Sequence, residues 1–271
     1  MSRLHLRQHA PDHEHRVIRV TPESAGWEYV GFDLYKLDAG ETARGETGDR
    51  EVCLVFISGK AAVTAGDEDF GSVGARMSPF EGKPWSVYVP AGASWTLTAE
   101  TPCEIAACSS PGAAGSCPPR VVGPDSHDVM TRGKGNNIRY VTDIINETDP
   151  ADSLLVVEVI TPAGNASSYP PHKHDRDQPP EETLLEETYY HRVDPPTGFG
   201  LQRVYTDDRS LDESFAFGDR DTILVPRGYH TVSAPPGCRL YYLNVMAGPV
   251  RSWAVSEDRE IAAAIAAERA L

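Results

Sequence analysis

The sequence repeats itself at an offset of 136 residues, so the two halves of the 271-residue chain are expected to fold alike. VYVPAGASWTLTA, residues 87–99, resembles ILVPRGYHTVSA, residues 223–234, and both contain a Pro-x-Gly turn. The same offset places Glu51 on Glu187, and 39 residues separate each glutamate from the proline of its turn. Two modules of equal internal spacing indicate a duplicated domain.

Short apolar runs rich in Val, Tyr, Trp and Thr fill both halves, and glycine or charged residues separate them. This composition predicts β-strands joined by tight turns. Only the last segment, EDREIAAAIAAERAL, has acids in a first turn and an alanine-rich body, which predict a helix. We therefore predict an all-β fold of two jelly-roll barrels with a short C-terminal helix.

The expected divisions follow the changes in composition, because Pro, Gly and Ser concentrate in connections. They are an N-terminal segment 1–26, a first barrel 27–108 without a metal site, a linker 109–137, a second barrel 138–256 with a metal site, and a helix 257–271.

The net charge of −15 argues against nucleic acid or an anionic membrane as a partner, since both favour basic surfaces. The sequence has no secretory h-region and no apolar stretch long enough to span a membrane. Five cysteines without a CxxC pattern indicate reduced thiols in a cytoplasmic protein. Cys103, Cys108 and Cys117 are a weak zinc candidate, because no fourth ligand of regular spacing follows. The sequence leaves homo-oligomerisation open.

The strongest functional motif is the pair His172 and His174. Side chains at i and i+2 of a strand point to the same face, and Tyr169-Pro-Pro before them favours an extended backbone. Neutral imidazoles beside a carboxylate suit a divalent transition metal. A solvated loop with exposed histidines is the alternative, and it is the preferred interpretation of the second such pair, His13 and His15.

The two halves differ where the site is expected. Allowing a one-residue gap, His230 stands where the first half has Trp95, which would pack in the core. Glu187 is the expected carboxylate, while Glu186 maps onto Arg50 and should face outward. The candidate metal ligands are therefore His172, His174, Glu187 and His230.

This combination resembles the cupin superfamily, in which an HxH motif, a glutamate and a histidine after a Pro-x-Gly turn bind one metal. Twelve residues separate His174 from Glu187, where the usual motif has three or four, and the turn is one residue shorter. The insertion DRDQPPEETLLE should therefore loop over the mouth of the site.

More specifically, the chain resembles the 5-deoxy-glucuronate isomerases of inositol catabolism, which are related to the 4-deoxy-5-keto-uronate isomerases. The resemblance rests on YPPHKHD (169–175), EETYYHR (186–192), GFGLQRVYTDDRSLDE (198–213), LVPRGYH (224–230) and YYLNVMAGP (241–249). It implies an aldose–ketose isomerase that converts 5-deoxy-D-glucuronate to 5-keto-2-deoxy-D-gluconate through a metal-stabilised enediolate. It also implies one divalent ion, and zinc, manganese and iron(II) would all fit.

The substrate of these isomerases carries a carboxylate, which a guanidinium binds well. The candidates in the matching strings are Arg227, Arg203, Arg192 and Lys173, with Arg227 first because it lies close to His230. The candidates for proton transfer are Tyr189, His191 and Tyr242. Strand parity places Tyr189 and His191 on the same face as Glu187.

Three other classes remain open from sequence. Another metal-dependent cupin enzyme, such as an oxygenase or a different uronate isomerase, would share the ligand set. A non-catalytic sugar-binding cupin is disfavoured by the absence of a DNA-binding region. A storage-type bicupin would not need the four ligands together.

Overall fold

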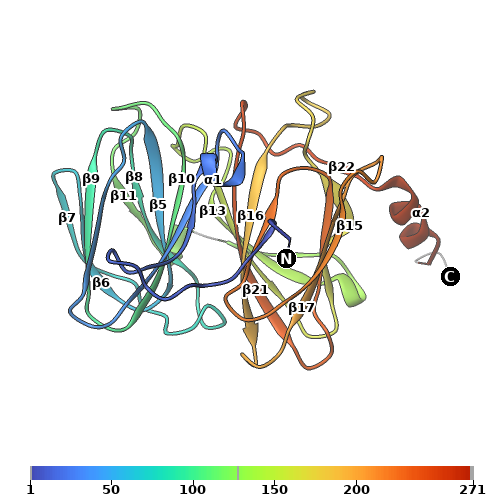
Figure 1. Ribbon diagram of the computed structural model, residues 1–271, viewed down its shortest axis with the longest axis horizontal. Helices are drawn as coiled ribbons and strands as arrows, with labels where there is room; N and C mark the ends of the chain where they lie inside the picture. Colours follow the sequence, from blue (N-terminus) through green and yellow to red (C-terminus); the bar gives the residue numbers. More distant parts are fainter. Residues whose placement is uncertain (1, 127, 269–271) are drawn as a thin grey trace.

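In the computed structural model, which describes residues 2–126 and 128–268, two β-barrels lie side by side (Figure 1). The N-terminal half forms one barrel and the C-terminal half the other, and the helix α2 (Arg259–Glu268) projects from the second barrel. The predicted all-β class with two jelly-roll barrels and a C-terminal helix is confirmed. The last three residues of the predicted helix, 269–271, lie outside the described part of the chain.

The first barrel consists of two antiparallel sheets. The six-stranded sheet has the order β11 (Arg120–Val122), β8 (Trp85–Val89), β5 (Arg50–Ser58), β10 (Cys103–Pro111), β3 (Gly31–Leu37) and β2 (Arg16–Val20). The four-stranded sheet has the order β4 (Thr42–Glu46), β9 (Ser94–Ala99), β6 (Ala61–Ala65) and β7 (Glu68–Val73). A short helix, α1 (Pro22–Ala25), lies between β2 and β3.

The second barrel repeats this plan. Its seven-stranded sheet has the order β1 (His5–Leu6), β19 (Thr222–Val225), β16 (Glu186–Asp194), β21 (Arg239–Ala247), β14 (Leu155–Thr161), β13 (Arg139–Ile145) and β12 (Val129–Arg132). The five-stranded sheet has the order β18 (Asp212–Phe217), β17 (Gly200–Tyr205), β20 (Tyr229–Ser233), β15 (Ala166–Lys173) and β22 (Ser256–Glu257).

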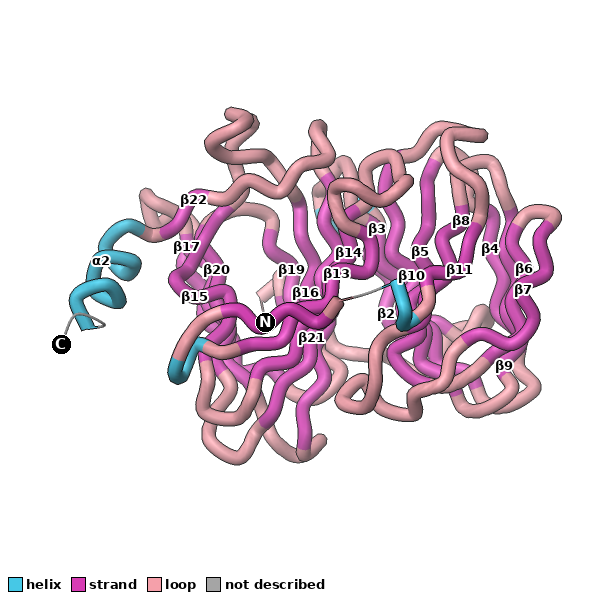
Figure 2. The backbone as a smooth tube through the Cα atoms, turned by 180° about the vertical axis from the view of Figure 1, so that it is seen from behind, coloured by secondary structure: helices cyan, strands magenta, loops and turns pink. Residues whose placement is uncertain are grey.

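The connecting segments contribute strands to both barrels. In the N-terminal segment, β1 pairs with β19 of the second barrel, so the chain starts there before it enters the first barrel. Within the expected linker 109–137, β11 extends the first barrel, and β12 pairs with β13 of the second. Two 3₁₀ turns, Pro124–Ser126 and Gly135–Asn137, lie beside these strands. Figure 2 shows the two barrels and these connections from behind.

Three apolar clusters stabilise this arrangement. One cluster fills each barrel, and the third lies between the barrels and combines residues of both. In the third cluster, the ring centroids of Phe32 of β3 and Tyr190 of β16 are 5.9 Å apart. Alternate residues of the long strands β5 and β16 therefore face a barrel interior or the interface, and both faces are buried.

Strand pairing corrects the predicted equivalence of Glu51 and Glu187. In the first barrel Val52 pairs with Val89, and in the second Glu187 pairs with Val225, which occupies the same place before the Pro-x-Gly turn as Val89. Val52 is thus the equivalent of Glu187, and Glu51 faces the interface. The sequence alignment was one residue out of register at this strand, which reverses the face of every side chain.

Glu51 is instead the equivalent of Glu186. Glu186 faces out of its own barrel, as predicted, but it does not reach solvent, because its side chain points at the first barrel and is only 9% exposed. Both glutamates accept hydrogen bonds from the other barrel's backbone, Glu186 from residues 28–30 and Glu51 from residues 152–154.

Candidate metal centre

Three histidines of the second barrel meet at one point. His172 lies at the end of β15 and His174 directly after it, and His230 comes from β20, where its Cα pairs directly with that of His172. One ring nitrogen of each histidine lies within 4.8 Å of the others. In the described part of the chain this is the one group of three or more His, Cys, Asp or Glu residues arranged to hold a metal ion.

An irregular stretch of β15 places the two histidines. Ser167 pairs with Val232 and His172 with His230, so five steps along β15 oppose two along β20. Pro170 and Pro171 lie in this bulge, where they fit because proline has no N–H for a ladder hydrogen bond. The predicted extended backbone before the histidines is therefore a strand with a bulge.

Glu187 lies beside two of the histidines. Its Oε2 is 3.0 Å from Nε2 of His174 and 3.1 Å from Nε2 of His230. The Nδ1 atoms of these histidines face carbonyl oxygens, of Leu185 at 2.9 Å and of Gly228 at 3.1 Å, so both Nδ1 atoms must donate. In a neutral imidazole, the Nε2 atom then carries a lone pair.

Three electron-pair donors thus converge, and either additional protons or a cation must lie among them. Nε2 of His230 is buried and makes no aligned hydrogen bond, although Oε2 of Glu187 is close. Histidines whose Nδ1 atoms are fixed by carbonyl groups, with Nε2 free to bind, are typical of metal ligands. These donor atoms fit a divalent transition metal.

Burial and the neighbouring charges change the pKa values of these groups. Burial would raise the pKa of Glu187, but His230 and His174 outweigh it and lower that pKa to about 2. Burial, followed by the charges of His230 and His174, lowers the pKa of His172 well below its usual value. A carboxylate beside a neutral imidazole is the form in which both groups bind metal.

The three candidates for proton transfer lie at different depths of the barrel. The Tyr189 ring lies 5.7 Å from that of His230, and its hydroxyl is 3.2 Å from Oγ of Ser168. The Tyr242 ring lies 5.0 Å from that of Tyr189. Burial raises the pKa of both phenols.

His191 lies deeper, two residues beyond Tyr189 on β16. Its ring stacks on Phe217 at 3.6 Å, its Nε2 is 2.8 Å from Oε1 of Gln202, and burial lowers its pKa to about 3. His191 shares the interior face with Tyr189, whose ring lies 5.8 Å from its own, and its part in proton transfer stays a prediction.

Two of the residues predicted to bind the substrate carboxylate, Lys173 and Arg227, lie outside the barrel interior. Lys173 alternates with the two ligand histidines, so it points to the other face, where Nζ is 3.2 Å from Asp175 and 2.6 Å from Asp207. Arg227 extends over the surface, with Nη2 3.3 Å from Oγ of Ser210.

The other two predicted arginines already bind protein carboxylates. Arg192 faces the barrel interface, where its guanidinium lies 2.9 Å from Glu104 and 2.8 Å from Asp219. Arg203 is exposed on the outer face of β17 and pairs with Asp212 at 2.8 Å. The prediction of all four cationic side chains as substrate ligands is thus corrected by their positions.

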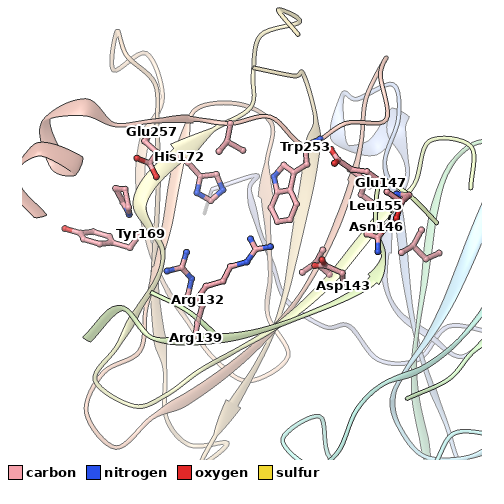
Figure 3. Close-up of a pocket in the computed structure, with 15 residues that line it drawn as sticks. Arg132, Arg139, Asp143, Asn146, Glu147, Leu155, Tyr169, His172, Trp253 and Glu257 are labelled. Atoms are coloured by element: carbon pink, nitrogen blue, oxygen red, sulfur yellow. Dashed lines mark hydrogen bonds between the residues drawn. The ribbon is translucent and has the colours of Figure 1, made fainter. Parts of the chain in front are cut away.

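A pocket of about 510 Å³ opens beside His172 (Figure 3). Its wall includes Trp253, Val255 and Glu257 rather than residues of the insertion 175–186, which was expected to cover the mouth. The insertion acts indirectly, because Oγ1 of Thr183 donates to the carbonyl of Ser252 at 2.7 Å and so fixes this wall.

Sequence reasoning missed two arginines in this pocket, Arg132 and Arg139. Arg132 fell in the expected linker, and Arg139 was assigned only to a strand. The available signal was the string TRGKGNNIRY, in which a Gly- and Asn-rich turn lies between the arginines as in a β-hairpin.

The first barrel has no equivalent of the histidines. Gly45 pairs with Trp95, as His172 pairs with His230, and a Cβ atom on Gly45 would lie 2.7 Å from the Trp95 ring. The indole is 4% exposed and packs edge-on against Tyr35 at 5.7 Å.

Comparisons with solved structures define the class of the fold. Oxalate decarboxylase from Lactobacillus farciminis superimposes with a TM-score of 0.64 at 14% identity, over 97% of this chain and 91% of that chain. An IolB-like protein from Salmonella typhimurium superimposes with a TM-score of 0.92 at 49% identity, over 96% and 98% of the two chains. The chain has the bicupin fold.

Sequence comparison then identifies the family. Residues 4–264 match the KduI/IolB family, and the chain belongs to it. It is 55% identical to a 5-deoxy-glucuronate isomerase of Geobacillus kaustophilus, over 95% of this chain and 94% of that protein. It is 45% identical to the 5-deoxy-glucuronate isomerase of Bacillus subtilis, over 89% and 90% of the two chains.

All five cysteines are free. Within the described residues, no helix has the length and apolar character needed to cross a membrane.

Proposed function

We propose that this protein is an aldose–ketose isomerase that converts 5-deoxy-D-glucuronate to 5-keto-2-deoxy-D-gluconate in the cytoplasm. The observation that carries the proposal is the convergence of three histidines in the second barrel of a chain 55% identical to a 5-deoxy-glucuronate isomerase. The pocket beside His172 has room for a sugar acid of this size.

His172, His174, Glu187 and His230 are the proposed ligands of one divalent ion. Zinc, manganese and iron(II) are all compatible with three imidazoles and one carboxylate. When bound, such an ion would supply a Lewis acid that stabilises negative charge developing on the substrate oxygens.

The protein's own residues must position the substrate and move protons. In this isomerisation a proton leaves C2 and one is delivered to C1, while the hydroxyl proton moves from O2 to O1. Tyr189 and Tyr242 are the proposed hydroxyl groups for this transfer, since the Tyr189 ring lies 5.7 Å from that of His230 and the Tyr242 ring lies next to that of Tyr189. The apolar barrel core beneath them excludes water from that side.

The decisive experiment is proton NMR of 5-deoxy-D-glucuronate with the purified protein, before and after chelation. Conversion to the keto acid that stops on chelation and returns on adding a divalent metal supports both the reaction and the ion. Conversion that survives complete metal removal would support the isomerase reaction and contradict the proposal that it depends on a metal ion. No conversion with loaded protein would overturn the reaction, and an oxygen electrode would then test an oxygenase.

A further inference from the structure

Two arginines face each other across a hairpin at the edge of the pocket. Arg132 at the end of β12 and Arg139 at the start of β13 are direct partners in the antiparallel register. Both line the same pocket as His172, and Figure 3 shows their guanidinium groups within it. Like charges placed directly opposite on paired strands repel each other. An anion between them would remove that cost.

Neither arginine has a carboxylate partner at close range among the described residues. The hydrogen bonds of Arg139 go to the carbonyl and side-chain oxygens of Asn137, at 3.2 and 3.4 Å. The Arg132 guanidinium lies over the Trp253 ring at 5.8 Å. Glu257 also lines the pocket and acts on Arg139 only through its longer-range charge. This contrasts with Arg192 and Arg203, whose guanidinium groups bind protein carboxylates.

The hairpin that carries the pair is fixed to the metal-binding strand. Nδ2 of Asn137 donates to the carbonyl of Tyr169 on β15 at 2.6 Å, and Nδ2 of Asn165 donates to the carbonyl of Ile138 at 2.9 Å. The arginines are therefore held at a defined position relative to His172, as a binding site requires.

A third donor lies in the same pocket. Nε1 of Trp253 is shielded from solvent and has no hydrogen-bond partner among the described residues. A buried indole N–H usually finds an acceptor. With the two guanidinium groups, it makes a set of donors that suits a carboxylate.

We propose that Arg139 and Arg132, assisted by the indole N–H of Trp253, bind the carboxylate of the sugar acid and so direct its carbonyl end toward His172. This inference rests on the proposed function and names the residues that select an acidic over a neutral sugar. It assigns the role to this pair in place of Arg227, Arg203, Arg192 and Lys173.

The test is calorimetric binding of a ligand that cannot isomerise. Borohydride reduction of 5-deoxy-D-glucuronate gives an alditol acid that keeps the carboxylate, and its primary amide is the neutral counterpart. Zinc-loaded wild-type protein should bind the acid at least about tenfold more tightly than the amide. Arg139→Met and Arg132→Met should lose this preference, and Arg139→Lys should keep only part of it, because an ammonium cannot bind in a bidentate manner.

Arg203→Met is the matched control, since it removes an arginine on the outer face and should bind both ligands as wild type does. Retention of the wild-type preference by both Met variants would overturn the inference, as would a wild-type protein that does not distinguish acid from amide. If circular dichroism shows that Arg139→Met is unfolded, Arg132→Met and Arg139→Lys provide the same comparison. These affinities are measured without turnover, so they are independent of the NMR assay for the reaction.

Discussion

Glu51 and Glu186 perform the same task in opposite directions across the barrel interface. Oxygens of Glu51 accept hydrogen bonds from the backbone N–H groups of residues 152–154, at 2.6 to 2.8 Å. Those of Glu186 accept from residues 28–30, at 2.7 to 2.9 Å. Each carboxylate thus fixes the backbone that leads into a strand of the other barrel, β14 or β3. Both barrels make this exchange, while among the described residues the candidate metal ligands lie in the second barrel alone.

Glu186→Gln and Glu187→Gln should separate stability from metal binding, because these neighbours point to opposite faces of β16. Glu186→Gln places an amide NH₂ against backbone N–H groups and should lower the free energy of unfolding by about 2–4 kcal/mol. Its metal content, measured by mass spectrometry after loading, should stay at the wild-type level. Glu187→Gln should lose bound metal and turnover.

His174→Ala provides a second test of the centre within the same experiment. It should lose the metal while circular dichroism shows an intact fold. Normal metal content in His174→Ala or Glu187→Gln would contradict the assigned site.

The fold and the convergence of the three histidines could be predicted because both depend on local pattern. Strand composition, the Pro-x-Gly turns and the HxH motif are each visible within a short stretch of sequence. The equivalence of Glu51 and Glu187 failed because equal spacing concealed a one-residue difference. The turns align at an offset of 136 residues, whereas the strand pairing aligns Val52 with Glu187, an offset of 135. Side-chain direction alternates along a strand, so that difference exchanges the interior for the interface.

The arginines proposed to bind the substrate could not be predicted in the same way. Arg203 and Arg192 lie in strings that match the isomerases, but Arg203 pairs with Asp212 across the β17–β18 hairpin, and a tertiary contact brings Glu104 to Arg192. Arg132 lies in a Gly-rich segment of linker composition, and Arg139 lies at the start of an expected strand. Their approach to His172 depends on strands brought together from distant parts of the chain.

Arg192→Met should destabilise the protein without changing the reaction. The Arg192 guanidinium is buried against Glu104 and Asp219, and removing it leaves these carboxylates without a full set of partners. We expect a loss of about 3–5 kcal/mol in the free energy of unfolding, measured with urea, and an unchanged KM. Arg239→Met, which removes an exposed pair with Asp194, should cost less than about 1 kcal/mol. A large rise in KM for Arg192→Met would restore it as a substrate ligand.

Gly45→Ala should destabilise the first barrel. The added Cβ atom would lie 2.7 Å from the Trp95 ring, which is fixed within the barrel core, so we expect a loss of about 1–3 kcal/mol. Gly218→Ala is the matched control, because its Cβ atom meets only an ordinary contact at 3.7 Å. Trp95→Phe should likewise lower the thermal midpoint and leave turnover unchanged. A loss of metal in Gly45→Ala would show that the two barrels are coupled more strongly than their separate cores indicate.

Asp33 should make the stability of the first barrel depend on pH. Its carboxyl group lies on the interior face of β3, and burial raises its pKa to about 6 although the charges of Arg16 and Arg19 oppose the rise. A pKa that is higher in the folded state than the usual 3.8 means that folding favours the protonated form. The contribution of protonated Asp33 to the free energy of unfolding is therefore fully present below about pH 4, and it is lost as the pH rises through about 6. Asp33→Asn removes the ionisation, so it should match wild type at pH 4.5 and gain about 1–3 kcal/mol at pH 8, measured by urea unfolding. If the free energies of unfolding of Asp33→Asn and wild type differ by the same amount at both pH values, the prediction is contradicted. The ion pair with Arg16, at 3.6 Å, would then keep Asp33 ionised throughout.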